Sequence, residues 1–443
     1  MIPGFLSKWR LSKGSIVAIA TIVVCLLQVK LNYNLVLVDK SGDRDGSLHH
    51  QKIPRRDPNS LPHDAPPHPV EGTNHLRKLL LSVPFYVYEE LAWINATLDG
   101  KPIQEFVHGS QQKHTDDFWF MKSALEHPLR TRNASHAKLF VIPSLHNLLD
   151  SRAFFKSRDL CVQSRCNNKL MKLAGKIVTS SPHFQAHPKA HLAVVSHFAH
   201  HKSWWTRGMP PLYLRMLQES SNIHFEDFPT NHPGGWSVPK LHVGRPCPWQ
   251  GQDKTQDVTL IASFKPNDDR FQDRETICTW LQTAGSVSSI RMEQCGPGPM
   301  CPALANAKLG FHVRGDTPSA SRLFDTILSG TVPIFTNVKQ YQVLPEWIDW
   351  KAISYFVNVN ESNAKDFVQQ VRVILDDVPT YQQKLKVLLA NRHWVDWTGL
   401  YPFDMYMYML QAHLYPETRH DPAIFFAPEP SKSILHLPPL VPS

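Results

Sequence analysis

The sequence predicts an α/β protein made of two tandem units, each about the size of a Rossmann-like domain and built on a parallel sheet. Short, near-continuous apolar runs alternate with stretches of helical length, which is typical of parallel strands covered on both faces. The alternation occurs twice, and a segment rich in Pro, Gly and Trp, 232–250, separates the two sets. A chain of 443 residues, 42% of them hydrophobic, has room for two such cores.

The first set of elements lies between residues 79 and 198. We expect strands where apolar residues run almost without a break, and helices where they recur with a period near 3.6. Pro143 ends one strand, because proline cannot donate to the hydrogen-bond ladder of a sheet. The expected strands are 85–88, 137–143 and 191–198, and the expected helices are 118–125 and a mixed stretch within 160–179.

The second set follows residue 250 and repeats the alternation. Helical stretches again separate successive strands, so we expect a second parallel sheet. The expected strands are 258–264, 307–313, 332–335 and 353–357, and the expected helices are 274–283, 319–329, 364–375 and 381–389.

The N-terminal 40 residues predict the compartment. Three basic residues, Lys8, Arg10 and Lys13, precede the apolar stretch 14–38, which is long enough to span a membrane if Lys30 lies at the far interface. Because the positive charges come first, we expect a signal anchor with a cytoplasmic N-terminus and a lumenal body. The alternative is a cleaved signal peptide with residues 16–27 as its apolar core, and the body is translocated in either case.

These observations predict the organisation of the whole chain. A Pro-, His- and Asp-rich stretch without periodicity reads as an extended stem. The expected parts are a cytoplasmic tail 1–13, a transmembrane segment 14–38, a flexible stem 39–78, an N-terminal Rossmann-like domain 79–245, a C-terminal Rossmann-like domain 246–414 and a Pro-rich tail 415–443.

The cysteines and sequons agree with a translocated body. Cys25 lies in the apolar span, and the other six cysteines make an even number, as disulfides require. The pairs Cys161–Cys166 and Cys295–Cys301 are the first local candidates, although the connectivity stays open. Three Asn-x-Ser/Thr sequons predict glycosylation at Asn95, Asn133 and Asn360.

The charge balance limits the ligand classes. The formal net charge of +9 is a mild basic excess that suits an anionic small ligand. It is too small for a histone-like coating of nucleic acid, so no nucleic-acid partner is expected.

The segment 309–335 carries the densest functional signal. A strand delivers Arg314 to the carboxyl end of the sheet, where open α/β sheets bind ligands. Pro318, Ser319 and Ser321 mark the start of a helix, whose N–H groups and dipole form an anion site. Arg314 and Arg322 add two forked cations suited to a diphosphate.

Two further residues complete this pattern. Asp325 follows Arg322 by one helical turn and is placed to accept hydrogen bonds from two sugar hydroxyls, as in a ribose site. Gly330 is expected to end the helix. Two plainer interpretations stay open: Arg322 and Asp325 as a surface ion pair, and Arg314-Gly315-Asp316 as an exposed adhesion tripeptide.

These motifs resemble the C-terminal signature of the exostosin-like glycosyltransferases, a family that includes heparan-sulfate polymerase subunits and plant and algal wall transferases. The matching positions are Arg314-Gly315-Asp316, Ser319, Ser321-Arg322-Leu323-Phe324-Asp325 and Gly330-Thr331-Val332-Pro333. Blocks at 85–88, 130–143 and 350–357 resemble the family in the same order. The sequence departs from the family pattern at Thr331, where the family has Cys, and at Ala190, where it has an acidic residue.

The resemblance implies a GT-B-like architecture, with two Rossmann-like domains facing a cleft and the nucleotide-sugar on the C-terminal one. It implies that Asp325 holds the ribose, and that Lys265 supplies a charge near the strand 258–264. Arg314, Ser319, Ser321 and Arg322 would hold the diphosphate, and Asp316 is a further candidate for binding the nucleotide-sugar. Family chemistry is inverting and metal-independent, with no cofactor besides the nucleotide-sugar.

Inversion needs a base from the N-terminal domain to take the proton of the acceptor hydroxyl. The candidates are His191 and Asp227, with His197 and Glu226 as further ones. The sequence thus predicts a single-pass type II Golgi membrane glycosyltransferase that transfers a hexosyl or pentosyl group to a polysaccharide or glycoprotein. The alternative is a catalytically inactive glycan-binding or partner subunit, which the change at Ala190 keeps open, and homo- or hetero-oligomers also stay open.

Overall fold

A computed structural model describes the part of the chain that carries the fold, within the compact unit 76–443. The described residues are 79–91, 97–98, 101–102, 115–143, 164–195, 210–224, 236–239, 241–247, 254–264, 271–283, 289–315, 318–359 and 362–419. None of the helices formed by these residues has the length and apolar character needed to cross a membrane. The predicted signal anchor 14–38 and stem 39–78 lie outside the described residues, and the predicted boundaries stay predictions.

The first sheet is entirely parallel, with the strand order β4-β1-β5-β6-β7-β8. Its strands are β1 Phe85–Val87, β4 Arg130–Thr131, β5 Leu139–Ile142, β6 His191–Val195, β7 Ser221–His224 and β8 Ser237–Pro239. Every residue of β5, β6 and β7 is buried, as expected for central parallel strands covered on both faces. The expected strands 85–88, 137–143 and 191–198 contain β1, β5 and β6, and residues 196–198 lie outside the described residues.

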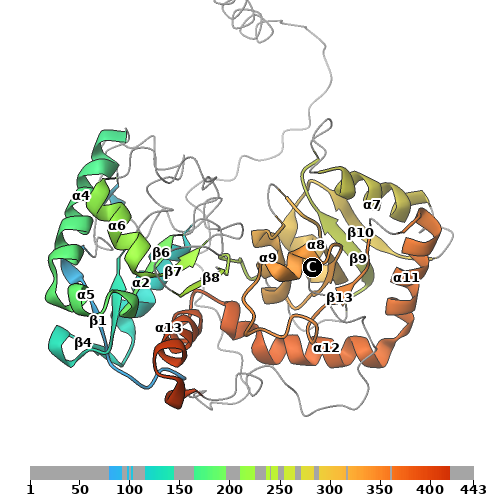
Figure 1. The fold of residues 1–443 in the computed structure, drawn as a ribbon. Helices are drawn as coiled ribbons and strands as arrows, with labels where there is room; N and C mark the ends of the chain where they lie inside the picture. The colour runs from blue at the N-terminus through green and yellow to red at the C-terminus, as the bar shows by residue number, and fades with distance from the viewer. Residues whose placement is uncertain are drawn as a thin grey trace, which may run out of the picture. The chain divides into compact units, whose positions relative to one another are not determined.

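Helices flank this sheet (Figure 1). They are α2 Asp116–Glu126, α4 Ser164–Ser180, α5 Pro182–Ala186 and α6 Pro211–Glu219, with short 3-10 turns η1 Glu89–Leu91, η4 Ala134–His136 and η6 Pro188–Ala190. A two-stranded antiparallel sheet pairs β2 Thr97–Leu98 with β3 Lys101–Pro102.

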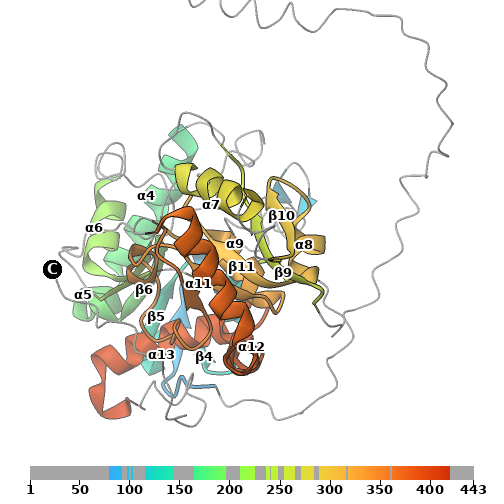
Figure 2. The same cartoon turned by 90° about the vertical axis from the view of Figure 1, so that its right-hand side faces the viewer.

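The second sheet is also parallel, in the order β10-β9-β11-β12-β13. Figure 2 shows β10, β9 and β11 of this sheet. Its strands are β9 Gln256–Ile261, β10 Met292–Gly296, β11 Ala307–His312, β12 Val332–Phe335 and β13 Tyr355–Phe356. The helices of this part are α7 Gln272–Thr283, α8 Met300–Asn306, α9 Ser321–Leu328, α10 Lys339–Gln342, α11 Ala364–Asp376 and α12 Val378–Asn391, followed by the 3-10 turn η8 Arg392–Val395. Two parallel α/β sheets confirm the predicted fold class, and the cleft between them stays a prediction.

The last long helix, α13 Tyr401–Leu414, contacts α2 of the first set. Its buried carboxylate, Asp404, accepts hydrogen bonds from the backbone N–H groups of Leu80 and Leu81 at 2.7 and 3.2 Å. His127 Nε2 lies 3.1 Å from the same carboxylate. Residues more than 300 positions apart are thereby joined, since a buried carboxylate must be satisfied by donors. The 3-10 turn η9 Pro416–Thr418 follows.

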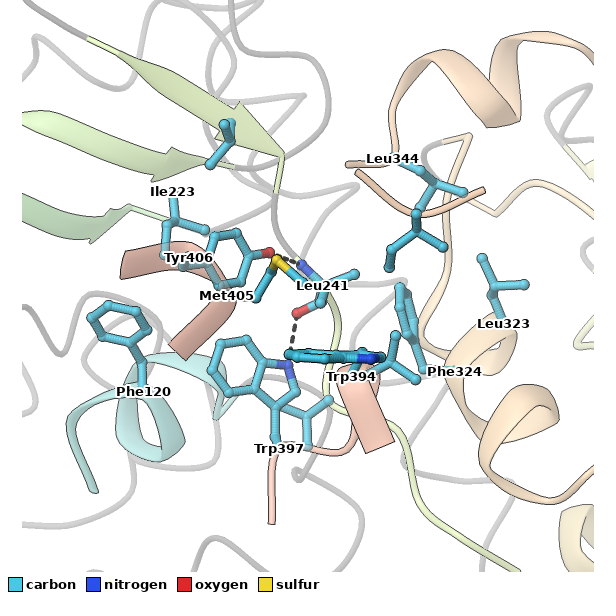
Figure 3. Close-up of a cluster of buried hydrophobic side chains, with 14 of the residues drawn as sticks. Phe120, Ile223, Leu241, Leu323, Phe324, Leu344, Trp394, Trp397, Met405 and Tyr406 are labelled. Carbon is cyan, nitrogen blue, oxygen red and sulfur yellow. Dashed lines mark hydrogen bonds between the residues drawn. The ribbon is translucent and has the colours of Figure 1, made fainter. Parts of the chain in front are cut away.

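A cluster of buried side chains surrounds Leu241, on the segment between the two sheets (Figure 3). Tyr406 Oη accepts a hydrogen bond from the Leu241 N–H at 2.6 Å, and Trp397 Nε1 donates to the Leu241 carbonyl at 3.1 Å. Phe120 of α2 and Phe324 of α9 belong to the same cluster. The segment is therefore fixed through both its backbone and its apolar side chain.

The disulfides correct one expectation. Cys301 pairs with Cys247 and Cys295 pairs with Cys278, so the expected pair Cys295–Cys301 is wrong. The Cα–Cα distances of 5.0 and 5.6 Å are ordinary for disulfides. Nearness in sequence misled the prediction, because β10 and α8 direct the two cysteines to different neighbours. The pair Cys161–Cys166 lies outside the residues whose side chains are described.

Candidate functional site

The predicted strand–turn–helix is present after β11. The strand ends at His312, Arg314 follows at the carboxyl edge of the sheet, and α9 begins at Ser321. In the described part of the chain no side chain caps α9 at Ala320, so its first N–H groups face the turn. Gly330 ends the helix with a φ of +64°, a conformation that favours glycine, and this prediction is confirmed.

A seven-residue segment, 241–247, runs along α9 and is called the strap below. Gly244 lies so close to α9 that an added Cβ would be 2.6 Å from the Phe324 carbonyl carbon. The Arg245 N–H donates to Asp325 Oδ1 at 2.6 Å, and the Cys247 N–H donates to Ser329 Oγ at 3.0 Å. The predicted ribose-binding carboxylate is thus held by the strap.

The strap also reaches the turn before α9. The His242 ring lies with Nε2 2.6 Å from Ser319 Oγ, and both side chains are buried. The predicted phosphate-binding residue Ser319 therefore has a fixed hydroxyl position. His242 and Arg245 were missed by the sequence analysis, because no periodicity or motif marks the residues of the strap.

The two predicted cations lie on this turn and helix. Burial lowers the pKa of Arg322, and the nearby Asp325 carboxylate opposes that change. An arginine remains charged at neutral pH despite such a shift. Arg314 is half-buried, and its Nε is a buried donor with no hydrogen-bond partner in the described part of the chain. A buried donor of this kind needs an acceptor, such as an anionic ligand.

Gly315 is buried, and the carbonyl of Arg314 accepts a hydrogen bond from Arg274. These two residues therefore do not form the exposed loop tip that the adhesion interpretation requires. Asp316 and Lys265 lie outside the described residues.

Thr331, which stands where the family has Cys, is hydrogen-bonded to a buried lysine. Lys254 is buried, and its Nζ donates to Thr331 Oγ1 at 2.9 Å and to the Leu304 carbonyl at 2.6 Å. The Thr331 hydroxyl also donates to the Leu304 carbonyl at 2.8 Å. Burial lowers the pKa of Lys254 to about 8. These bonds connect the end of α8 to the residue that precedes β12.

The candidate base His191 is 0% exposed and stacks on Phe140 with ring centroids 4.4 Å apart. Its Nδ1 lies 2.9 Å from the His187 carbonyl, and its Nε2 lies 2.9 Å from Tyr88 Oη. Burial lowers the pKa of His191 to about 3, although the bond to the His187 carbonyl opposes this. Packing and these two bonds account for the ring without a catalytic role, and its role as base stays a prediction.

Several other predicted residues fall in two groups. The first group lies outside the described residues and contains Asp227, His197, Glu226, Asn95 and Asn360. Asn133 is exposed at the start of η4, and its Oδ1 accepts from the Ser135 N–H and hydroxyl at 3.1 and 2.7 Å. Within the described ranges, no three His, Cys, Asp or Glu side chains gather as a metal site would require.

Two parallel α/β units and a turn with two arginines and a carboxylate define an α/β protein with a candidate anion site at a sheet edge. A family model, the Exostosin GT47 domain, matches residues 80–371, which is more than half of the 443 residues. The chain therefore belongs to the exostosin GT47 family, and the resemblance found in the sequence is confirmed. This membership supports a glycosyltransferase.

Solved structures show weaker likeness. A glycosyltransferase from Rickettsia africae ESF-5 has 10% sequence identity and a TM-score of 0.33, with 75% of this chain and 97% of that chain covered. TarM has 9% identity and a TM-score of 0.29, with 49% of this chain and 50% of that chain covered, so the match spans about half the length of TarM. Accessory secretory protein 1, 2 and 3 from Streptococcus pneumoniae has 9% identity and a TM-score of 0.30, with 56% and 57% covered. No curated protein matches the chain.

Proposed function

We propose that this protein transfers a sugar from a nucleotide-sugar to a glycan or glycoprotein acceptor, with the nucleotide bound at the β11–α9 turn. The observation that carries the proposal is the set of groups around this turn: the buried Arg314 Nε and the start of α9, neither of which has a side-chain partner among the described residues, and Arg322 with Asp325 on the first turns of α9. Donors at one end and a carboxylate one turn further match a diphosphate followed by a ribose.

The bond between Asp325 and the strap is compatible with ribose binding. A carboxylate has about four lone-pair directions, so one backbone N–H and two sugar hydroxyls can be accepted together. The strap then has a clear role, since it orients the carboxylate before the nucleotide arrives. Preorganised groups of this kind cost no reorganisation when the ligand binds.

The proposed chemistry is a direct displacement with inversion. The acceptor oxygen forms a bond to the anomeric carbon while the bond to the phosphate oxygen breaks, and a base takes the acceptor proton. Arg314, Arg322 and the first N–H groups of α9 stabilise the charge that develops on the leaving diphosphate. A metal is not needed in this proposal, and the base is not assigned. On the charge pattern around 14–38, we further infer a type II Golgi membrane protein with a lumenal body.

Nucleotide release by the purified full-length protein, measured with a panel of UDP- and GDP-sugars and a mixture of glycan acceptors, tests the proposal. We expect release with one donor class, reduced about 100-fold or more by Arg322→Gln and by Asp325→Asn. Two matched controls are Arg215→Gln on α6 and Asp376→Asn on α11, which change exposed i,i+4 pairs and should leave release unchanged. Glycan binding without release from any donor would instead support the inactive, glycan-binding alternative.

A further inference from the structure

A third arginine, Arg274 in the first turn of α7, lies beneath the β11–α9 turn. It is only 4% exposed. Its Nε donates to the Arg314 carbonyl at 2.9 Å, and its Nη1 donates to the Ser263 carbonyl at 2.8 Å. The guanidinium also lies over the Phe271 ring, 4.5 Å from the centroid. One rigid fork therefore fixes the chain just beyond two neighbouring strands, β9 and β11.

The turn is shaped around this fork. A Cβ added at Gly315 would lie 3.0 Å from Arg274 Nη2, which is tighter than ordinary contact, so the glycine allows the guanidinium to approach the backbone. The residue before this glycine is Arg314, whose carbonyl is bound to Arg274 while its own Nε is buried without a partner in the described ranges. Arg274 thus fixes the backbone of the residue whose Nε has no hydrogen-bond partner among the described residues.

The first turn of α7 also lies within the field of Arg314. Burial raises the pKa of Asp273, and the charge of Arg314 opposes that rise. Two neighbouring residues of α7 therefore interact with Arg314: Arg274 through a hydrogen bond to its carbonyl, and Asp273 through the charge of its side chain.

We propose that Arg274 is a positioning residue for the second phosphate of the donor: it holds the Arg314–Gly315 turn so that the Arg314 side chain and the turn backbone meet that phosphate. This inference rests on the proposed function. It predicts that Arg274 affects recognition of a diphosphate far more than recognition of a monophosphate, because only the diphosphate reaches the turn that Arg274 fixes.

The decisive variant is Arg274→Lys, which keeps the charge but replaces the planar guanidinium fork with a single, smaller ammonium group. Dissociation constants of UDP, UMP, GDP and GMP are measured by calorimetry on the full-length protein and on Arg274→Lys. For the nucleotide that the wild type binds, we expect the preference for the diphosphate over the monophosphate to fall about tenfold, one well-formed charged contact being worth that factor. Arg215→Lys, on an exposed helix face, is the matched control and should keep the wild-type preference.

A purely structural role would weaken both nucleotides of a pair by the same factor, and this result would overturn the inference while leaving the proposed function in place. Failure of the wild type to bind either diphosphate would overturn both. Should Arg274→Lys not fold, as judged by its thermal melt, Gly315→Ala disturbs the same contact from the opposite side. It is expected to show the same selective loss for the diphosphate, and an unchanged preference in it would count against the inference.

Discussion

Acid should destabilise this protein through His191. The His187 carbonyl is only an acceptor, so Nδ1 of His191 carries the proton and Nε2 accepts from the Tyr88 hydroxyl. The ring is therefore neutral in the fold, and burial lowers its pKa to about 3. In the unfolded chain the same ring has an ordinary pKa of about 6.5. As the pH falls through that value the unfolded state binds a proton that the folded state does not, and stability is lost.

The size of the loss follows from the two pKa values. Between pH 7 and pH 5 the unfolded ring becomes almost fully protonated while the folded ring stays neutral, which lowers the free energy of unfolding by about 2 kcal/mol. At pH 5 the figure depends on the unfolded value alone, because the folded pKa of about 3 lies far below the pH. The loss continues down to that lower value and then stops.

The comparison of the protein with His191→Gln isolates this effect from the other histidines. Urea unfolding at pH 7 and at pH 5 gives the free energy of unfolding of each form. We expect the variant to be less stable at pH 7, and the difference between the two forms to shrink by about 2 kcal/mol at pH 5. His136→Gln, at an exposed position, is the control and should show no such change. A difference that stays constant within about 0.5 kcal/mol would refute the reasoning about a buried, neutral ring.

Three other predictions concern stability. Gly244→Ala should lower the free energy of unfolding by about 1–3 kcal/mol in a urea titration, because its Cβ would meet the backbone of Phe324; a neutral result would mean that the strap can move away from α9. Lys254→Met should cost about 1–3 kcal/mol by the same measurement, since it removes the hydrogen bonds of the ammonium to the Leu304 carbonyl and to Thr331 Oγ1, and an unchanged midpoint would contradict the role given to the ammonium. Cys278→Ser should lower the Tm in a thermal melt by an amount equivalent to about 2–5 kcal/mol, because it breaks the disulfide with Cys295. Cys295→Ser should cause a similar loss, and the double variant should lose no more than either single variant.

The sequence predicts best those elements whose buried residues are almost all apolar. Strands β5, β6, β11 and β12 lie inside the apolar runs, and α9 lies between a Ser-rich start and Gly330. Strand β7 was missed because three of its four buried residues, Ser221–His224, are polar. The side chains of Ser221 and Asn222 donate hydrogen bonds to backbone carbonyls, and no sequence pattern indicates such bonds. Helix α13 was missed for a related reason, since its buried Asp404 and Gln411 interrupt the apolar pattern and bind residues near position 80.

The site shows the same division. The turn, its glycine and the helix start could be predicted, because local chemistry fixes them. The partners could not, since His242, Arg245 and Arg274 come from other elements and meet the turn only in the folded chain. One signal was available for Arg274: it precedes Ile277, Cys278 and Leu281 at helical spacing, so an arginine occupies the first position of a buried stripe. A charge in such a stripe is a reason to look for a buried acceptor.

The strap has a consequence for anyone who dissects this protein. The strap is more than a flexible linker between the two sheets. The backbone of Leu241 is hydrogen-bonded to Tyr406 of α13 and to Trp397, which follows η8. At its other end, Cys247 forms a disulfide with Cys301 of α8. A fragment starting at residue 246 would lose the ring that touches Ser319 and the amide that holds Asp325. In a chimera that combines the two halves of related proteins, the junction should therefore lie upstream of residue 241. The strap and α9 then come from the same parent.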